Sequence, residues 1–205
     1  QPTQFLLGLA ITMLTCLCLI GSVVYQKKSR GRMVTRIQTK TEQFLHRIRP
    51  LYYSKTLLWG LIGVGMLVHT AQYLFSRSLH IDEAALALNI LNRSFAGLLQ
   101  PLDNNQAAPL GFLLIERALV QLFGDSEYVL RLVPFLSAIF SILVFSWLAR
   151  AYLRPAAVPV ALGLFVLSEP LIYFSSTVKQ YSSDVLIALL LYAVIQDLQA
   201  KELTI

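Results

Sequence analysis

Apolar and polar segments alternate along the chain in long blocks. A helix needs about 20 predominantly apolar residues to cross the hydrocarbon core of a bilayer. Runs near that length, with few charges, recur through the sequence. We therefore expect five membrane-spanning helices, at 5–25, 57–75, 129–148, 155–174 and from 185–195 onward.

The segment 76–128 separates the second and third runs and is neither continuously apolar nor strongly basic. From Ala84 its apolar positions recur at helical spacing, and polar positions take the other face. This part is too polar to span and is typical of a helix that lies in the membrane interface. The apolar positions are Ala84, Ala87, Leu88, Leu91, Phe95 and Leu98.

A second apolar stretch inside this segment, 110–123, is too short to span and has Glu116 and Arg117 at its centre. A charge at the bilayer centre costs at least about 2.5–3.5 kcal/mol. We expect a second interfacial helix here rather than a crossing. The predicted fold class is thus all-α and polytopic, with five spans and two interfacial amphipathic helices.

Composition supports the integral-membrane class. Of the 205 residues, 56% are hydrophobic and only 14% are charged, whereas a soluble domain is typically about 25% charged. We divide the chain into an extra N-terminal transmembrane helix (1–26), a basic cytoplasmic segment (27–56) and a transmembrane module (57–205).

Basic residues set the expected orientation. Nine of the 17 Lys and Arg residues lie between the first two runs. Such a cluster marks a cytoplasmic loop near anionic lipid more often than a nucleic-acid site, so no nucleic-acid partner is expected. With 110–123 uncrossed, the loops 76–128 and 175–184 share the outer face. Counting 110–123 as a crossing would move Lys179 inside and Arg150 outside, against the positive-inside rule.

Within the second run, Gly60, Gly63 and Gly65 match the spacing of a dinucleotide fingerprint only superficially. That motif needs a strand before it and a helix after it. In a continuous membrane helix, small residues instead favour close packing between helices. We interpret His69, near the outer end of the same run, as a packing residue.

Two charged clusters are expected to meet at the outer face. Asp82 and Glu83 lie in the first outer loop, and Lys179 and Asp184 in the second. A carboxylate and a cation suit the transfer of a group from a phosphate: the carboxylate accepts the acceptor's proton and the cation neutralises the leaving phosphate. Three alternatives stay open: ion or proton transport, a structural metal site, and acids that only mark helix N-termini.

Several motifs in the two loops resemble one known family. Ala-Pro-Leu-Gly-Phe-Leu-Leu-Ile-Glu-Arg runs over 108–117, Phe-Gly-Asp-Ser-Glu-Tyr over 123–128, Leu-Arg-Leu over 130–132 and Lys-Gln-Tyr over 179–181. With the Asp-Glu pair, their order resembles the first half of the catalytic module of GT-C membrane glycosyltransferases. The nearest branch holds dolichyl-phosphate-mannose–protein mannosyltransferases and bacterial aminoarabinose or lipopolysaccharide-core sugar transferases. The resemblance covers 57 to about 195.

The resemblance implies roles for individual residues. Asp82 would be the catalytic carboxylate, and Glu83 would support it or help to hold a metal. A divalent cation is the one cofactor implied, with Asp82, Glu83 and Asp184 as its ligands. The implied substrate-binding residues are Arg131, Lys179, Gln180, Tyr181 and Asp184.

The sequence also departs from the family pattern. Ala107 and Ala108 stand where some relatives carry a charged residue before the loop proline, and Asn105 or Gln106 would substitute only weakly for its contact with a metal or phosphate. The run at 5–25 has no family role, and the family's further spans and a further outer loop are absent. We therefore expect the chain to be the N-terminal part of the module within a larger membrane protein.

The implied activity is transfer of a sugar from a polyprenyl-phosphate donor to a glycan, lipid or protein acceptor, with inversion, at the outer face of a membrane. We favour a bacterial plasma membrane over the endoplasmic reticulum. The alternative is a non-catalytic multi-pass protein, either a transporter piece or an assembly subunit. The predicted spans carry almost no ionisable residues apart from His69, which argues against a proton relay.

Overall fold

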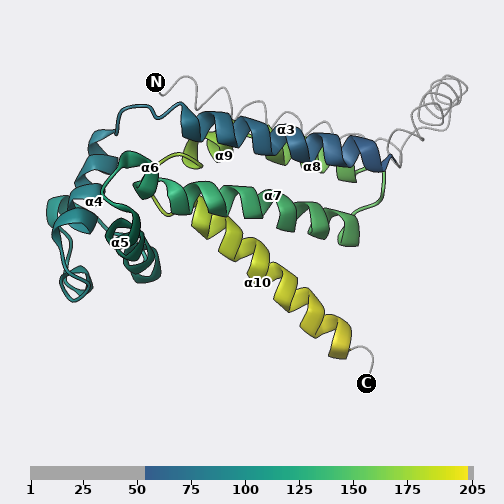
Figure 1. Cartoon of the computed structure of the whole chain (residues 1–205). Coiled ribbons are helices and arrows are strands. Elements are labelled where there is room, and N and C mark those ends of the chain that lie inside the picture. Colours follow the sequence, from purple (N-terminus) through teal and green to yellow (C-terminus); the bar gives the residue numbers. More distant parts are fainter. Residues whose placement is uncertain (1–53, 203–205) are drawn as a thin grey trace, which may run out of the picture. The chain divides into compact units, whose positions relative to one another are not determined.

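The computed structural model describes residues 54–202, and these residues form helices joined by short connections (Figure 1). The expected span at 5–25 and most of the basic segment at 27–56 lie outside the described residues. No strand occurs between 54 and 202, so the all-α prediction is confirmed there. In chain order the helices are α3 (Lys55–Leu74), α4 (Ile81–Asn92), η1 (Gly97–Leu99), η2 (Asp103–Asn105), α5 (Leu110–Phe123), α6 (Glu127–Leu130), α7 (Leu132–Tyr152), α8 (Val158–Val166), α9 (Glu169–Phe174) and α10 (Tyr181–Glu202).

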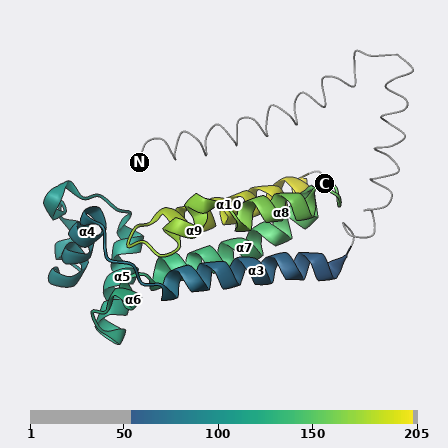
Figure 2. The same cartoon turned by 90° about the horizontal axis from the view of Figure 1, so that it is seen from above.

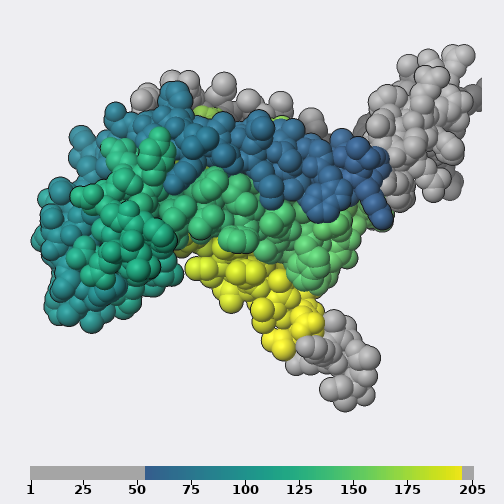
Figure 3. Space-filling model, viewed as in Figure 1, coloured from purple at the N-terminus to yellow at the C-terminus, as the bar shows by residue number. Residues whose placement is uncertain are grey.

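Three helices in this part of the chain are long and apolar enough to cross a membrane: α3, α7 and α10 over Tyr181–Gln199. They correspond to the runs expected at 57–75, 129–148 and from 185 onward. Figure 3 shows α10 reaching past α7 with much of its surface uncovered. The side chains of Ile187, Leu191 and Leu198 are more than half exposed, as lipid-facing positions of a spanning helix would be.

The run at 155–174 is two short helices, α8 and α9, rather than the one continuous helix that we expected. The break falls just before Glu169-Pro170. Pro170 lacks a backbone N–H, and its ring would clash with the carbonyl four residues earlier in a continuous helix, whereas both features are tolerated in a first turn, so the chain restarts as a new helix with Pro170 in its first turn. Glu169 is also an exposed acid inside this expected span, besides the His69 that we noted among the spans.

Helix α8 packs beside α3 and α7, as the view in Figure 2 shows. The core between them holds four fully buried side chains: Ile62, Ile142, Leu162 and Val166. Gly65 permits this close approach, because a Cβ there would lie 2.8 Å from the Cβ of Val166. The predicted packing role is therefore confirmed for Gly65. Around Gly60 and Gly63 there is open space.

Helices α4, α5 and α6 form a separate cluster beyond the ends of α3 and α7 (Figure 1). Its core is apolar and also includes Val178 from the second loop; the other buried members are Leu86, Ala87, Ile90, Leu98, Phe112, Leu113, Val120 and Leu130. Helix α5 presents Ile115, Leu122 and Phe123 on its exposed side. The two helices expected in the first loop thus exist as α4 and α5.

Candidate functional site

An open pocket of about 260 Å³ lies where α4 meets the connection between α9 and α10. Four of the predicted site residues line it: Asp82, Glu83, Lys179 and Tyr181. Four further side chains complete the lining: His80, Tyr173, Phe174 and Thr177. The structure therefore brings the first and second loops together at one end of α3, α7 and α10.

The two adjacent acids, Asp82 and Glu83, differ in their exposure to solvent because of where α4 begins. The helix starts at Ile81, so Asp82 and Glu83 lie in its first turn, where the helix dipole favours negative charge. Successive residues of a helix point about 100° apart. The side chain of Asp82 consequently faces solvent and the pocket, whereas Glu83 is only 3% exposed.

Both carboxylate oxygens of Glu83 are occupied. Arg77 Nη2 donates to Glu83 Oε1 at 2.7 Å, and the Val178 backbone N–H donates to Glu83 Oε2 at 3.2 Å. The guanidinium of Arg77 also lies over the ring of Tyr173, 4.4 Å from its centroid. Glu83 therefore joins α4 to the second loop, and its charge is already balanced.

Asp82 is the carboxylate that remains free. Within residues 54–202, the side chain of Asp82 has neither a hydrogen bond nor an ion pair. An unpaired carboxylate that faces a pocket can accept a proton or bind a cation, whereas the neutralised Glu83 cannot do so without breaking its buried contacts.

Lys179 is the complementary free cation. Its Nζ donates to Gln106 Oε1 at 2.7 Å, and across the described chain no carboxylate pairs with it. The turn that carries Lys179 is fixed by its neighbours: Thr177 Oγ1 donates to the Phe174 carbonyl, and Ser175 Oγ donates to the Ile172 carbonyl. A half-buried ammonium with only an amide oxygen as partner is suited to binding an anion.

Three aromatic rings form one wall of the pocket. Tyr173 and Phe174 meet edge to face at 5.2 Å between centroids, and Phe174 meets Tyr181 in the same way at 4.6 Å. Tyr181 is the first residue of α10. These rings give the pocket an apolar side next to the charges of Asp82 and Lys179.

Arg131 does not line this pocket, although we predicted that it contacts substrate. Its side chain is fully buried, donates to the backbone carbonyl of Arg77 and pairs with Glu127 at 3.3 Å. A weaker bond reaches Ser76 Oγ at 3.4 Å. Arg131 thus holds the connection between α3 and α4 in place, and Arg77 with it.

Two other predicted residues also lie apart from the pocket lining. Asp184 is exposed in the first turn of α10, and Gln180 is half-buried with its Oε1 unpartnered. The predicted metal ligands Asp82, Glu83 and Asp184 are not gathered into one cluster. No group of three or more His, Cys, Asp or Glu side chains suited to a metal ion occurs in the described part of the chain.

Sequence reasoning missed Arg77 and two rings of the aromatic wall, Tyr173 and Phe174. Arg77 carried one signal, a basic residue on the side expected to be poor in basic residues. Gln106 lies three residues before the loop proline, Pro109, and we expected it to substitute only weakly for the charged residue of some relatives. The contributions of Tyr173 and Phe174 depend on the restart of the chain at α9, and no local pattern in the sequence marked them.

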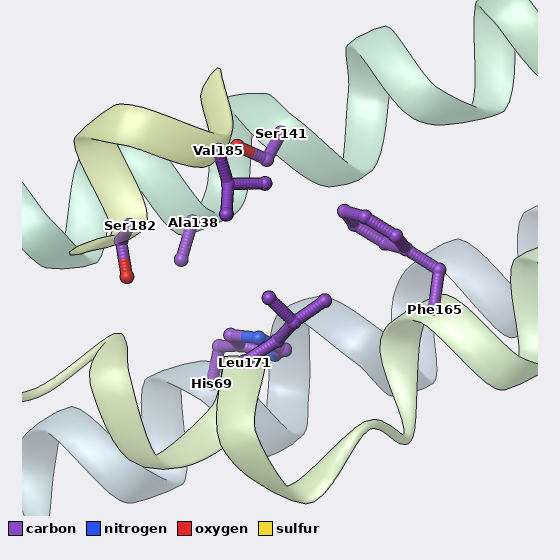
Figure 4. A pocket seen from close by; sticks show the side chains of 7 residues that line it. All are labelled: His69, Ala138, Ser141, Phe165, Leu171, Ser182 and Val185. Carbon is purple, nitrogen blue, oxygen red and sulfur yellow. The ribbon is translucent and has the colours of Figure 1, made fainter. Parts of the chain in front are cut away.

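A second cavity lies deep between the helices and has a volume of only about 10 Å³. Figure 4 shows His69, Ser141 and Ser182 around it, together with the apolar side chains Leu171 and Phe165. His69 is buried, and its Nδ1 bonds to the Gly65 carbonyl at 2.9 Å. The cavity has room for about one water, so it is no substrate site.

Glu116 is the other buried acid in the cluster formed by α4, α5 and α6. It is fully buried in α5, and neither of its oxygens has a partner. Burial without a compensating charge raises the pKa of Glu116 to about 9. The carboxyl group is therefore protonated and neutral at pH 7. The neighbouring Arg117 instead donates to the carbonyls of Ile90 and Leu91 at the end of α4.

Comparison with protein-family models, with curated proteins and with solved structures finds no match to this chain. The assignment of a function therefore depends on the chemistry of the pocket and on the sequence motifs that resemble GT-C glycosyltransferases. The structure adds one fact to those motifs, namely that Asp82 and Lys179 line the same pocket.

Proposed function

We propose that this chain carries a catalytic pocket for glycosyl transfer from a polyprenyl-phosphate sugar. The observation that supports it best is the presence of one unpaired carboxylate, Asp82, and one cation without an acidic partner, Lys179, in a single pocket. Nucleophilic displacement of a phosphate needs one group of each kind.

In the proposed reaction, Asp82 removes the proton from the acceptor's hydroxyl or amine. The acceptor atom then attacks the anomeric carbon from the side opposite the phosphate. The bond between that carbon and the phosphate oxygen breaks, and its electron pair leaves with the phosphate. Lys179 stabilises the added negative charge, and the new glycosidic bond has the inverted configuration.

The position of the pocket suits a lipid-linked donor. It lies at the end of three helices that are long and apolar enough to span a bilayer. A polyprenyl chain would stay in the hydrocarbon core while its phosphate reached Lys179 at the interface. The rings of Tyr173, Phe174 and Tyr181 would contact the sugar or the first isoprene units.

The finer topology belongs to the same proposal. We place α4 and α5 in the interface at the outer face, with 27–56 on the cytoplasmic side, in a bacterial plasma membrane. A divalent cation, if the reaction uses one, would find its free carboxylate ligand in Asp82. The acceptor is a glycan, a lipid or a protein.

The test is a transfer assay on the full-length protein in membrane vesicles, supplied with radiolabelled polyprenyl-phosphate sugars and with membrane lipids and glycans as acceptors. The wild type should label an acceptor, whereas Asp82→Asn and Lys179→Met should not. Asp125→Asn is the matched control, because Asp125 is an exposed acid of the same cluster outside the pocket. Equal labelling by wild type and Asp82→Asn would refute the proposal.

A further inference from the structure

We infer that Gln106 is a built-in cap on the anion site of the pocket: its amide oxygen occupies the place on Lys179 that a phosphate oxygen takes, so the ligand must displace it. This inference depends on the proposed function only for the identity of the ligand, a phosphate group. The cap itself follows from the contacts of Gln106 and Lys179.

The contact between Lys179 Nζ and Gln106 Oε1 is short, at 2.7 Å, and joins residues 73 positions apart. It is the only polar contact of this ammonium among residues 54–202. A neutral amide is a weaker partner for an ammonium than an anionic oxygen, since the ammonium and the anion also attract each other as opposite charges. The amide of Gln106 therefore occupies the position of a ligand on Lys179 but leaves the charge of the ammonium without an anionic partner.

The backbone next to Gln106 is firmly held. Asn89 Oδ1 accepts from the Asp103 N–H at 2.9 Å, and Asn89 Nδ2 donates to the Asp103 carbonyl at 3.3 Å. Arg93 pairs with the Asp103 carboxylate at 2.8 Å. The loop is thus anchored three residues before Gln106, and the cap can leave by rotation of its own side chain.

The cap gives the site selectivity for charge. A neutral sugar offers Lys179 a hydroxyl, which is no better a partner than the amide of Gln106. A phosphate offers a charged oxygen and can replace the amide at a net gain. Inorganic phosphate and the headgroup of a lipid phosphate share this chemistry, and only the lipid also has an apolar part to contact Tyr173 and Phe174.

The experiment measures equilibrium binding of two probes, inorganic phosphate and a polyprenyl phosphate without sugar, to the full chain in nanodiscs. Gln106→Ala removes the amide that competes for Lys179 and should tighten binding of both probes about tenfold, the worth of one hydrogen bond to a charged group. Gln106→Glu places a carboxylate on Lys179 and should weaken binding at least tenfold. Lys179→Met should abolish binding of inorganic phosphate.

The two substitutions at Gln106 must act in opposite directions. If Gln106→Ala binds both probes as the wild type does, or more weakly, the cap is refuted. The relative affinity of the two probes identifies the ligand. Tighter binding of the polyprenyl phosphate indicates a lipid headgroup, and equal binding indicates free phosphate; with opposite effects of the two substitutions, either result supports the cap. Tm values equal to that of the wild type establish that the variants are folded.

The outcome is separable from that of the proposed function. If Gln106→Ala tightens binding and Gln106→Glu weakens it, but the protein transfers no sugar, the cap is supported and the glycosyltransferase assignment is refuted. If the protein transfers sugar, but Gln106→Ala binds the phosphate probes as tightly as the wild type does, the glycosyltransferase assignment is supported and the cap is refuted.

Discussion

The Glu83 carboxylate accepts a hydrogen bond from the backbone N–H of Val178, at 3.2 Å, across 95 positions of sequence. Both groups are buried. Because Asp82 precedes Glu83 and Lys179 follows Val178, this one bond fixes the two unpaired charges relative to each other. The arrangement of the pocket therefore depends on a residue whose own carboxylate is already paired.

Replacing Glu83 should destabilise the protein. Glu83→Ala leaves the Val178 N–H and the Arg77 guanidinium without an acceptor, and each buried unsatisfied group costs about 1–3 kcal/mol. Thermal unfolding in detergent, followed by circular dichroism, should show a clear drop in Tm. Asp82→Ala is the control, since an exposed residue should change stability by no more than about 0.5 kcal/mol. Equal Tm values for the two variants would contradict the role of Glu83 in joining α4 to the second loop.

Arg131 should affect folding rather than ligand binding. Arg131→Met keeps the length of the side chain but removes its bonds to the Arg77 carbonyl and to Glu127. We expect a loss of about 1–3 kcal/mol in the free energy of unfolding. Below the Tm, the Kd for a polyprenyl phosphate should stay within about threefold of the wild type. A folded variant with a stable Tm and abolished binding would restore the role in substrate binding that the sequence suggested.

Gly65 should be intolerant of a side chain. Gly65→Ala places a Cβ 2.8 Å from Val166, and such overpacking typically costs about 1–3 kcal/mol. Gly63→Ala is the matched control, because it adds the same methyl group to the same helix in open space. A lower Tm for the first variant and an unchanged or higher Tm for the second would support the packing of α3 on α8. Similar Tm values would refute it.

Glu116 should make stability depend on pH. Its pKa is about 9 in the folded chain against an ordinary value of 4.5, so the folded state binds more protons than the unfolded state between these values. The contribution of protonated Glu116 to the free energy of unfolding is therefore complete below pH 4.5. It falls as pH rises toward 9, by up to about 1.4 kcal/mol per pH unit. Glu116→Gln should flatten the plot of Tm against pH and raise the Tm at pH 8. A wild-type plot as flat as that of the variant would contradict this burial.

Much of the fold follows from patterns that single segments carry. The runs that became α3, α7 and α10 are apolar over a spanning length, and α5, with Glu116 and Arg117 at its centre, is not among the described helices long and apolar enough to cross a membrane. The interruption of 155–174 was also readable, because Glu169-Pro170 sits inside it. The apolar length of this run predicts one span, but in the structure the local effect of Pro170 prevails.

The site was less predictable than the fold, because tertiary contacts decide which of its side chains are paired and which remain available. The charge distribution predicted that Asp82 and Lys179 would share one face. Nothing local distinguishes Asp82 from Glu83, since their different roles depend on the partners Arg77 and Val178. The Gln106 contact likewise joins two loops that only the folded chain brings together.

The most direct test of the account compares sugar transfer by wild type and Asp82→Asn at saturating polyprenyl-phosphate sugar. We predict that the variant keeps its Tm and binds the donor with a Kd within about twofold of the wild type, while its transfer rate falls by about 10²–10⁴-fold, the usual contribution of a general base. Transfer at the wild-type rate would contradict the central claim that Asp82 is the catalytic base.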